Sequence, residues 1–470
     1  MPAYKTPDVY IEEIPVFPPS VAEVETAIPA FVGYTEKATK STDNDLILKP
    51  TQITSMKEFE QLFGDCYYDT IAISIEASGD TFTSSSFTPP TAEYLLWYAM
   101  KMFFDNGGGK CYVVSVGLYQ SSPNISNEGE ADSADIDVRY GLLDGIKAVQ
   151  DEDEPTLLVV PESVNLGSTE YQALVQAMLL QCATLQDRFS IFDIFDGDTK
   201  LDSSQLDTNR SYFGNNHLKY GAAYYPFLKT GMVYKVKADK SNVNVTVGSD
   251  AAAQLGTIET SQTAAYNFVM NKIKEAYVTL PPSAAVAGIY AMTDANRGVW
   301  KAPANVSINN VISPVIKTDT LYQDSLNVDA ATGKSINAIR SFMGKGTLVW
   351  GARTLAGNDN EWRYVSVRRF FNTVEESVKK STYWAVFEPN DANTWVKVRG
   401  MIEAYLNQKW REGALVGAKP DDAFFVRCAL GVTMNAQDIL EGRMNVEIGM
   451  AVVRPAEFIV LKFSHKLQTS

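Results

Sequence analysis

The order of apolar and polar positions predicts strands at both ends of the chain. The first 36 residues hold two strand-like runs on either side of a proline cluster, and they show no helical period. Ser55–Gly64 is predicted to form a short helix, because Ser55 can cap its start, an apolar face follows and Gly64 can end it. The Ser- and Thr-rich residues 78–90 are predicted to form a loop.

Between residues 91 and 195, short apolar strands alternate with helices. The predicted helices run from Thr91 to the segment DNGGGK, from Ile136 to Val149 and over Ser168–Leu185, and the predicted strands are CYVVSVG, TLLVVP and RFSIFDIF. Strands that are apolar throughout and alternate with helices are typical of a mainly parallel sheet covered on both faces. The polar stretch 121–137 is predicted to be a solvated excursion.

The rest of the chain does not continue this alternation of strands and helices. Residues 229–280 are rich in β-forming residues and include an Ala-rich helix, so we interpret them as an insertion or subdomain. The last third is interpreted as a separate α+β unit. Its predicted elements are the strand GTLVWGAR, helices over Tyr364–Trp384 and Asn393–Trp410, the strand AFFVRCALGVT, and closing strands over Met444–Val453 and Ala456–Phe463.

Composition places the chain among globular proteins. With 470 residues, of which 45% are hydrophobic and 21% charged, two or three domains are expected. The best candidate for a membrane span, Ile448–Phe463, is interrupted by Arg454, Pro455 and Glu457, so no membrane insertion is expected. The N-terminus does not have the pattern of a secretory signal peptide, so we expect no export by the general secretory route.

The cysteines and histidines predict no metal centre. Cys66, Cys111, Cys182 and Cys428 are widely spaced, and the chain has two histidines. We therefore expect buried, reduced thiols in a protein of the cytoplasm.

Charge is distributed unevenly along the chain. The net charge of −15 argues against a nucleic-acid partner, because neutralising phosphates needs a basic face. Residues 337–470 carry 18 Lys and Arg against 14 Asp and Glu, whereas residues 1–336 carry 23 against 42. The C-terminal third is therefore electrostatically different from the rest.

Segments that resemble catalytic motifs do not fit the chemistry of those motifs. The ATGKS segment lacks the first glycine of a phosphate-binding loop, because Val328 stands in its place. The NGGGK segment ends a helix instead of starting one, and the acidic FDIFDGDTK does not have calcium-loop spacing. His217 and His465 are too isolated for a catalytic triad. Hydrolysis by paired carboxylates that meet in space stays open.

The run WRYVSVRRFF mixes arginines with aromatic residues. In so acidic a chain, we expect Arg363, Arg368 and Arg369 to pair with carboxylates, in the same subunit or in a neighbour, instead of binding nucleic acid.

Several ordered blocks resemble the tail sheath proteins of contractile phage tails and related injection particles. They are TPDVYIEEIPVFPPSVAEVETAIPAFVGYTE, PPSAAVAGIYAMTDANRGVWKAPAN, INAIRSFMGKGTLVWGARTL, WRYVSVRRFFNTVEESV, WAVFEPNDANTWVKVR and RPAEFIVLKF. The resemblance covers the first 36 residues and nearly all of residues 281–463, and it is looser over 37–280. Asp8 stands where the family usually has Gly, a turn position that Asp tolerates nearly as well.

The resemblance implies a multidomain fold with α/β and α+β parts. An inner α+β domain would be built from residues 21–50 and 336–453. Residues 51–335 would form an outer α/β domain, with the insertion at about 229–280.

The resemblance also implies that residues 1–20 and 454–470 are extended β-arms, which complete the sheets of neighbouring subunits. The residues expected to pair are Val9, Tyr10, Ile11, Glu12 and Ile14 in the first arm and Phe458, Val460, Leu461 and Phe463 in the second. A terminal strand that nothing covers is an aggregation hazard. Head-to-tail exchange of such strands, in contrast, builds helical polymers.

The function implied is structural, with no catalysis and no cofactor. Copies of the chain would stack as rings in a helical lattice around an inner tube protein, with baseplate and terminal cap proteins at the ends, and contraction would drive the tube through a target envelope. The turn with Asn435, Asp438, Glu441 and Arg443 is the candidate for tube contact, and a less acidic C-terminal third would suit an acidic tube. The particle would assemble in the cytoplasm and then be released by lysis or anchored.

Two other classes of function stay open at this point. An α/β enzyme of unknown substrate would use the strands TLLVVP and RFSIFDIF, but it would leave the terminal strands unexplained. A non-contractile shell protein would form closed shells or fibres, whereas a sheath forms hollow cylinders of defined helical symmetry.

Overall fold

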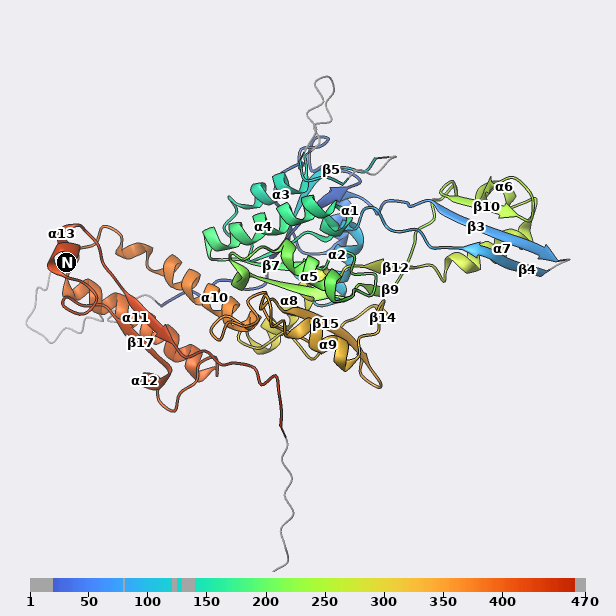
Figure 1. Cartoon of the computed structure of the whole chain (residues 1–470). Helices are drawn as coiled ribbons and strands as arrows, with labels where there is room; N and C mark the ends of the chain where they lie inside the picture. The colour runs from blue at the N-terminus through green and yellow to red at the C-terminus, as the bar shows by residue number, and fades with distance from the viewer. Residues whose placement is uncertain (1–19, 79–80, 121–124, 129–139, 461–470) are drawn as a thin grey trace, which may run out of the picture. The chain divides into compact units, whose positions relative to one another are not determined.

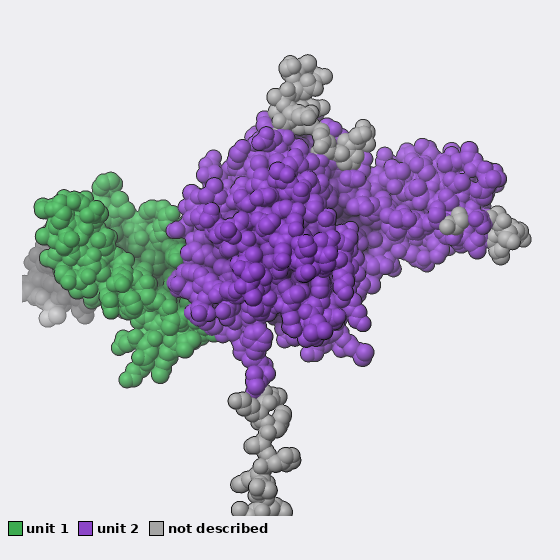
Figure 2. Space-filling model, viewed as in Figure 1, with its two compact units in different colours: residues 1–24, 374–453 green, residues 25–373, 454–470 purple. Residues whose placement is uncertain are grey.

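The chain was analysed as a computed structural model, which describes residues 20–78, 81–120, 125–128 and 140–460 (Figure 1). It divides into two compact units (Figure 2). The small unit comprises Val374–Val453 with the described residues before Glu25. The large unit comprises Glu25–Thr373 with the residues from Arg454 onwards.

A nine-stranded sheet forms the centre of the large unit. Its strands in spatial order are β13 (Val306–Ser307), β16 (Gly346–Val349), β15 (Ile336–Phe342), β8 (Gly221–Tyr225), β7 (Phe189–Asp193), β6 (Leu157–Val159), β1 (Pro29–Thr35), β5 (Cys111–Leu118) and β2 (Thr51–Ile53). The run from β15 to β5 is parallel throughout, and β2, β16 and β13 are antiparallel to their neighbours. The prediction of a mainly parallel sheet is confirmed.

Helices cover both faces of this sheet (Figure 1). One face carries α2 (Leu96–Asp105) and α8 (Ser283–Arg297), and the other carries α3 (Leu142–Val149), α4 (Ser168–Leu185) and α5 (Ser203–Tyr212). Successive residues of β1 point into different cores, because side chains alternate along a strand. Phe31 packs with α2 and α8, whereas Ala30 and Val32 pack with α3 and α4.

The strand order reverses at β1. The chain passes from β1 to β5 on one side and then returns through α3 to β6 on the other side of β1. In open sheets of this kind, ligands bind outside the carboxyl ends of the strands at the point of reversal. In this chain, that point lies at the ends of β1 and β6.

A four-stranded sheet in the large unit combines two distant segments. Its strands in order are β11 (Ala253–Gln254), β10 (Val243–Val247), β3 (Ile71–Ser78) and β4 (Thr81–Phe87), with α6 (Leu255–Ile258) and α7 (Thr263–Ile273) beside them (Figure 1). The prediction of a loop over residues 78–90 is wrong, because β4 pairs with β3 over its whole length. Its Ser- and Thr-rich composition resembles a loop, yet Thr and Phe also favour an extended chain.

The remaining elements of the large unit complete its core. A three-stranded antiparallel sheet has the order β12 (Tyr277–Leu280), β9 (Leu228–Val233) and β14 (Val311–Pro314). The other helices are α1 (Met56–Phe63), α9 (Thr320–Asn327), η1 (Pro161–Asn165) and η2 (Leu218–Tyr220). α1 confirms the predicted caps, since Ser55 accepts a bond from the backbone N–H of Glu58 and Gly64 ends the helix with φ +86°.

The small unit is built from helices and a short sheet. α10 (Val365–Ser381) enters it from the large unit, and η3 (Tyr383–Ala385), α11 (Ala392–Arg411), α12 (Pro420–Ala423), β17 (Phe424–Arg427), α13 (Ala436–Leu440) and β18 (Glu447–Met450) follow. The two long helices were predicted within a few residues of these bounds.

Other predictions for the last third differ from the structure. The strand GTLVWGAR was assigned to a separate C-terminal unit, but β16 pairs with β15, which joins the large sheet through β8. The strands expected around β17 and β18 are shorter than predicted. Residues 454–460, where a closing strand was expected to begin, pair with no strand among the described residues.

Candidate assembly interface

The chain is fastened to the small unit at the first residues that the structure describes. The backbone N–H groups of Ala22 and Val24 donate to the hydroxyls of Ser381 and Ser377 of α10, each at 3.1 Å. The Nζ of Lys409, which is 3% exposed, donates to Glu23 at 2.7 Å. The segment that follows the predicted N-terminal arm is therefore held by side chains, not by a sheet.

The other end of the chain is fastened to the large unit by Glu457. Its carboxylate accepts bonds from the Arg353 guanidinium, with distances of 2.6–3.1 Å, and from Asn327 at 2.9 Å. Burial opposes ionisation of Glu457, but the Arg353 guanidinium, together with the bonds from Asn327 and Tyr364, outweighs burial and lowers the pKa of that carboxyl. Arg353 is 4% exposed, so this bidentate pair is an internal anchor.

Three apolar side chains come directly after this anchor. Phe458, Ile459 and Val460 are 71%, 80% and 75% exposed. Consecutive apolar residues with this exposure need a partner that covers them. Of the predicted arm residues, Phe458 and Val460 are thus placed, whereas Leu461 and Phe463 lie outside the described residues. The N-terminal set Val9, Tyr10, Ile11, Glu12 and Ile14 lies outside them as well.

The small unit presents a two-stranded sheet with no third strand among the described residues. β17 and β18 are antiparallel, in a register that runs from Phe424 opposite Met450 to Arg427 opposite Glu447. A two-stranded sheet is marginally stable alone, and its edges are templates for further strands. Apolar side chains around this sheet are exposed, namely Val416, Phe425, Leu430 and Val432.

Exposed apolar residues are concentrated in the small unit. Among the described residues, nine large apolar side chains are exposed there, although the unit is much the smaller of the two. They are Tyr383, Val386, Phe387, Val396, Val416, Phe425, Leu430, Val432 and Leu440. The small unit therefore exposes more large apolar side chains for its size than the large unit does.

The four residues predicted to contact a tube form one local network. Asn435 caps α13 by accepting from the N–H of Asp438, and the Asp438 carboxylate accepts from the N–H of Asn435 in return. Arg443 pairs with both Asp438 and Glu441, at 3.0 and 2.5 Å. The structure thus brings the four together and gives them a role in shaping this turn, on which Leu440 is 82% exposed.

The excess of positive charge in the C-terminal third does not come from the small unit. Residues 374–453 carry 9 Lys and Arg against 11 Asp and Glu, so the excess lies outside them. Part of it is also internal, because Arg353, Arg368 and Arg369 are 2–4% exposed. The electrostatic argument for tube contact therefore loses its basis in this unit.

The three arginines of WRYVSVRRFF have different partners. Arg369 pairs with the buried Asp294 at 2.5 and 3.0 Å, as predicted. Arg368 donates to Asn372 and lies over the ring of Trp362 at 4.3 Å. Arg363 donates to the carbonyl of Gly357 and to the side chain of Asn360. The prediction of carboxylate partners is confirmed for Arg369.

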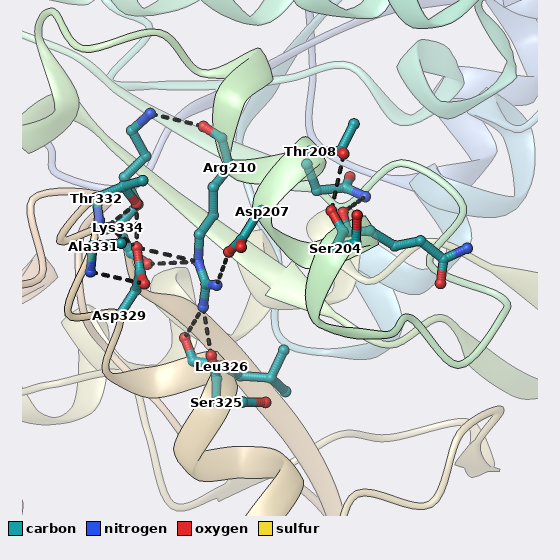
Figure 3. A network of polar contacts seen from close by, with 12 residues as sticks. Ser204, Asp207, Thr208, Arg210, Ser325, Leu326, Asp329, Ala331, Thr332 and Lys334 are labelled. Carbon is teal, nitrogen blue, oxygen red and sulfur yellow. Dashed lines mark hydrogen bonds and ion pairs between the residues drawn. The ribbon is translucent and has the colours of Figure 1, made fainter.

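The ATGKS segment is part of an internal polar network (Figure 3). The carboxylate of Asp329 accepts from the N–H groups of Ala331 and Thr332 and lies 3.9 Å from the Arg210 guanidinium. Arg210 donates to the end of α9 through the carbonyls of Ser325 and Leu326, and its own carbonyl accepts from Lys334 at 2.8 Å. The lysine that resembled a phosphate ligand thus fastens a loop.

The cysteines, the possible metal ligands and the lengths of the helices bear on other kinds of site. All four cysteines are free and buried, as the sequence predicted. Within the described residues, no group of three or more His, Cys, Asp or Glu could hold a metal ion. No described helix is both long and apolar enough to cross a membrane.

These surfaces define a protein that acts through association with other chains. Comparison with family models agrees, because residues 229–355 match the central domain of the phage tail sheath protein. Residues 357–466 match the phage tail sheath C-terminal domain.

Curated relatives carry the same description. The tail sheath protein of Enterobacteria phage T4 is 28% identical over 149 residues, which cover 30% of this chain and 21% of that protein. A putative prophage major tail sheath protein of Pseudomonas aeruginosa (strain UCBPP-PA14) is 27% identical over 182 residues, or 38% of this chain and 44% of that protein. The aligned part therefore spans less than half of each relative.

Solved structures match the whole chain. The helical sheath of the anti-feeding prophage in its contracted state has a TM-score of 0.65 and 31% identity, and the match covers 99% of this chain and 100% of that chain. The contracted PVC sheath complex of an extracellular contractile injection system has a TM-score of 0.66 and 29% identity, with 99% of each chain covered. The chain belongs to the phage tail sheath family. It is a structural subunit of a contractile sheath, in a phage tail or tail-like particle.

Sequence reasoning missed the residues that fasten the two ends of the chain. Arg353 and Lys409 lie in unremarkable contexts, and their acidic partners Glu457 and Glu23 are distant in sequence. The one local signal is that Glu457 interrupts an otherwise apolar closing segment.

Proposed function

We propose that copies of this chain assemble by exchanging their terminal arms. In this proposal, residues 1–20 and 454–470 of one copy add strands to the β17–β18 sheet of its neighbours. The observation that carries it is the two-stranded sheet with exposed apolar surroundings in the small unit. Strand addition would supply backbone hydrogen bonds to its edges and cover the apolar side chains.

The fastening of both ends supports this proposal. The Glu23–Lys409 pair holds the chain where the first arm would leave the small unit. The Glu457–Arg353 pair holds it where the second arm would leave the large unit. A pull on either arm would therefore act on a folded unit and not on a slack linker. Because each copy gives and receives strands, the lattice would stay connected while its other interfaces change.

The small unit is proposed as the inner part of the sheath, without residues 25–50, which belong to the large unit through β1. It would surround an inner tube protein, and the subunit rings would lie between baseplate and terminal cap proteins. The large unit would form the outer part, with the four-stranded sheet as its decoration. Contraction would exchange one packing of the same subunits for another and needs no covalent chemistry. The extended packing would persist through a kinetic barrier.

Cysteine cross-linking between two differently labelled copies tests the strand exchange. One copy carries Tyr10→Cys in the arm, and the other carries Glu447→Cys in β18 or Ala451→Cys directly after it. The buried native cysteines give a low background. We expect disulfide-linked dimers in assembled material for at least one of these pairs, since paired strands bring Cα atoms within about 6 Å.

Ser203→Cys at the start of α5 is the matched control, because it is exposed and belongs to the large unit, outside the β17–β18 sheet. Assembled polymer in which neither Glu447→Cys nor Ala451→Cys links above the level of this control would contradict strand exchange at this sheet.

A further inference from the structure

Glu162 lies at the point of the large sheet where ligands bind in related topologies. It directly follows β6 and Pro161, and its side chain is fully buried. Its Oε2 accepts from the backbone N–H of Tyr34 in β1 at 2.9 Å. Its Oε1 accepts from the N–H groups of Leu95 and Leu96 at 3.0 and 3.2 Å. One carboxyl group thus joins β1, β6 and the start of α2.

The N-terminus of α2 has no cap of its own. Leu95 is the N-cap residue, and no side chain at that position accepts a hydrogen bond. The free N–H groups and the dipole at a helix N-terminus make it a binding place for oxyanions. Here, Glu162 supplies the oxygen from a different element.

Gly33 supplies a second, independent sign of a cradle. A Cβ atom at this position of β1 would lie 2.6 Å from Oε2 of Glu162 and 3.1 Å from Cβ of Leu96. A glycine inside a strand marks a place where a ligand or another group approaches the backbone closely. The absence of a side chain at Gly33 therefore leaves room beside β1 for the carboxyl group of Glu162.

We propose that Glu162 is a built-in ligand, which fills an oxyanion cradle formed by Gly33, the N–H of Tyr34 and the N-terminus of α2. In sheets of this strand order, a bound ligand occupies the crevice at the reversal point. In this chain, a side chain lies at this point and joins β1 to the start of α2. This inference stands whether or not the arms exchange strands.

Chemical rescue tests this proposal on the purified, unassembled chain. Glu162→Ala should leave three buried N–H groups unbonded and lower the Tm by roughly 10 °C. Formate should restore most of this loss in a saturable manner, because it fits the vacated cradle. The experiment is made at pH 9, since burial raises the pKa of Glu162 to about 8. Sodium chloride at equal ionic strength should restore nothing.

Glu162→Gln is the matched control. It fills the same volume, so formate should not change its Tm. A Glu162→Ala variant as stable as the wild type, or one that loses stability without any response to formate, would overturn the proposal.

Two further single variants cover the case in which Glu162→Ala does not fold. Gly33→Ala should lower the Tm of the wild type, because its methyl group meets the carboxyl oxygen. In the Glu162→Gln background, hydrogen exchange at Tyr34, Leu95 and Leu96 should be faster, while exchange at Ser283 should not change. Unchanged exchange at Tyr34, Leu95 and Leu96 would refute the role of the carboxyl group.

Discussion

At the scale of single residues, the large unit contains buried ion pairs and buried carboxyl groups. Arg369 and Asp294 are 3% and 6% exposed, and the same carboxylate accepts a bond from Thr26 at 2.7 Å. The pair therefore fixes the chain just before β1 to α8 and α10. Removing one partner leaves a buried charge without compensation.

We predict that Arg369→Ala lowers the free energy of unfolding by about 3–5 kcal/mol. Arg399→Ala is the control, since Arg399 and Glu403 are 42% and 46% exposed and such a pair contributes less than about 1 kcal/mol. Urea unfolding followed by tryptophan fluorescence measures both. Equal losses in the two variants would mean that the Arg369 pair is not the anchor described.

A second prediction concerns pH. Burial raises the pKa of Glu162 to about 8 and that of Asp193 and Asp69 to about 7, from ordinary values of 4.5 and 3.8. The folded chain therefore holds protons that the unfolded chain releases between about pH 4 and pH 8. Stability from these groups is greatest at the acid end of this window and falls as pH rises through it.

Urea midpoints measured at pH 5.5, 7 and 8.5 should consequently decrease in this order, and Glu162→Gln should flatten the trend. Carboxyls with a lowered pKa, such as that of Glu457, act below about pH 4.5 and leave this window unaffected. A midpoint that rises with pH over the same range would contradict the assignment.

The sequence predicted the kind of partner that Arg369 has, but it did not predict the site around Glu162, and the reason is physical. Arg369 lies in a run with two other arginines, and in so acidic a chain a carboxylate partner was expected for each of them. Glu162 and Gly33 carry no such signal, because a carboxyl group bonded to backbone N–H groups depends on how three distant elements meet. Sequence patterns report local periodicity, and this cradle is not local.

At the scale of elements, the four-stranded sheet shows how two insertions depend on each other. β3, from residues 71–78, lies at its centre and pairs with β10, from residues 243–247. Each segment alone is thus a two-stranded piece, β3–β4 or β10–β11, and the pairing of β3 with β10 joins the two. The sequence predicted the second segment as an insertion but not the first, because the polar strand β4 was interpreted as a loop.

Excision of these segments tests the dependence. β9 and β12 are antiparallel, and the N–H of Tyr234 donates to the carbonyl of Ala276, so a short turn can replace residues 235–275. We predict that this excision alone leaves the β3–β4 hairpin without its partner and yields aggregates. Joint replacement of residues 71–87 by a second short turn should restore a soluble monomer.

Size-exclusion chromatography distinguishes these outcomes. A monodisperse product from the single excision would show that β3 and β4 do not need β10. Aggregation of the double excision would show that the large sheet itself depends on this four-stranded sheet.

For the strands of the last third too, the sequence predicted some features of the fold and not others. Their apolar patterns predicted that they exist, but the pattern does not state the partner. β16 joins the large sheet because β15 continues the parallel order beyond β8, a pairing set by the path of the whole chain. β17 and β18 were predicted too long, because apolar residues continue along the chain beyond the positions that pair.

At the scale of the whole molecule, the large unit has a closed core and the small unit has an unfinished surface. In the large unit, Glu162 joins β1 to the start of α2, and helices cover both faces of the sheet. The small unit exposes apolar side chains around a two-stranded sheet. Membership of the sheath family followed from ordered blocks of sequence, whereas the unfinished surface needed the three-dimensional arrangement.

The central claim is that a subunit of this family completes its lattice through its terminal arms. Electron microscopy of the full-length protein, beside a variant that lacks residues 1–20, tests it most directly. The claim predicts hollow, helically ridged tubes for the full chain, with an inner-tube partner supplied if needed. It predicts separate rings or monomers for the truncated chain, with an unchanged Tm. Ordered tubes of equal length and stability from both proteins would contradict it.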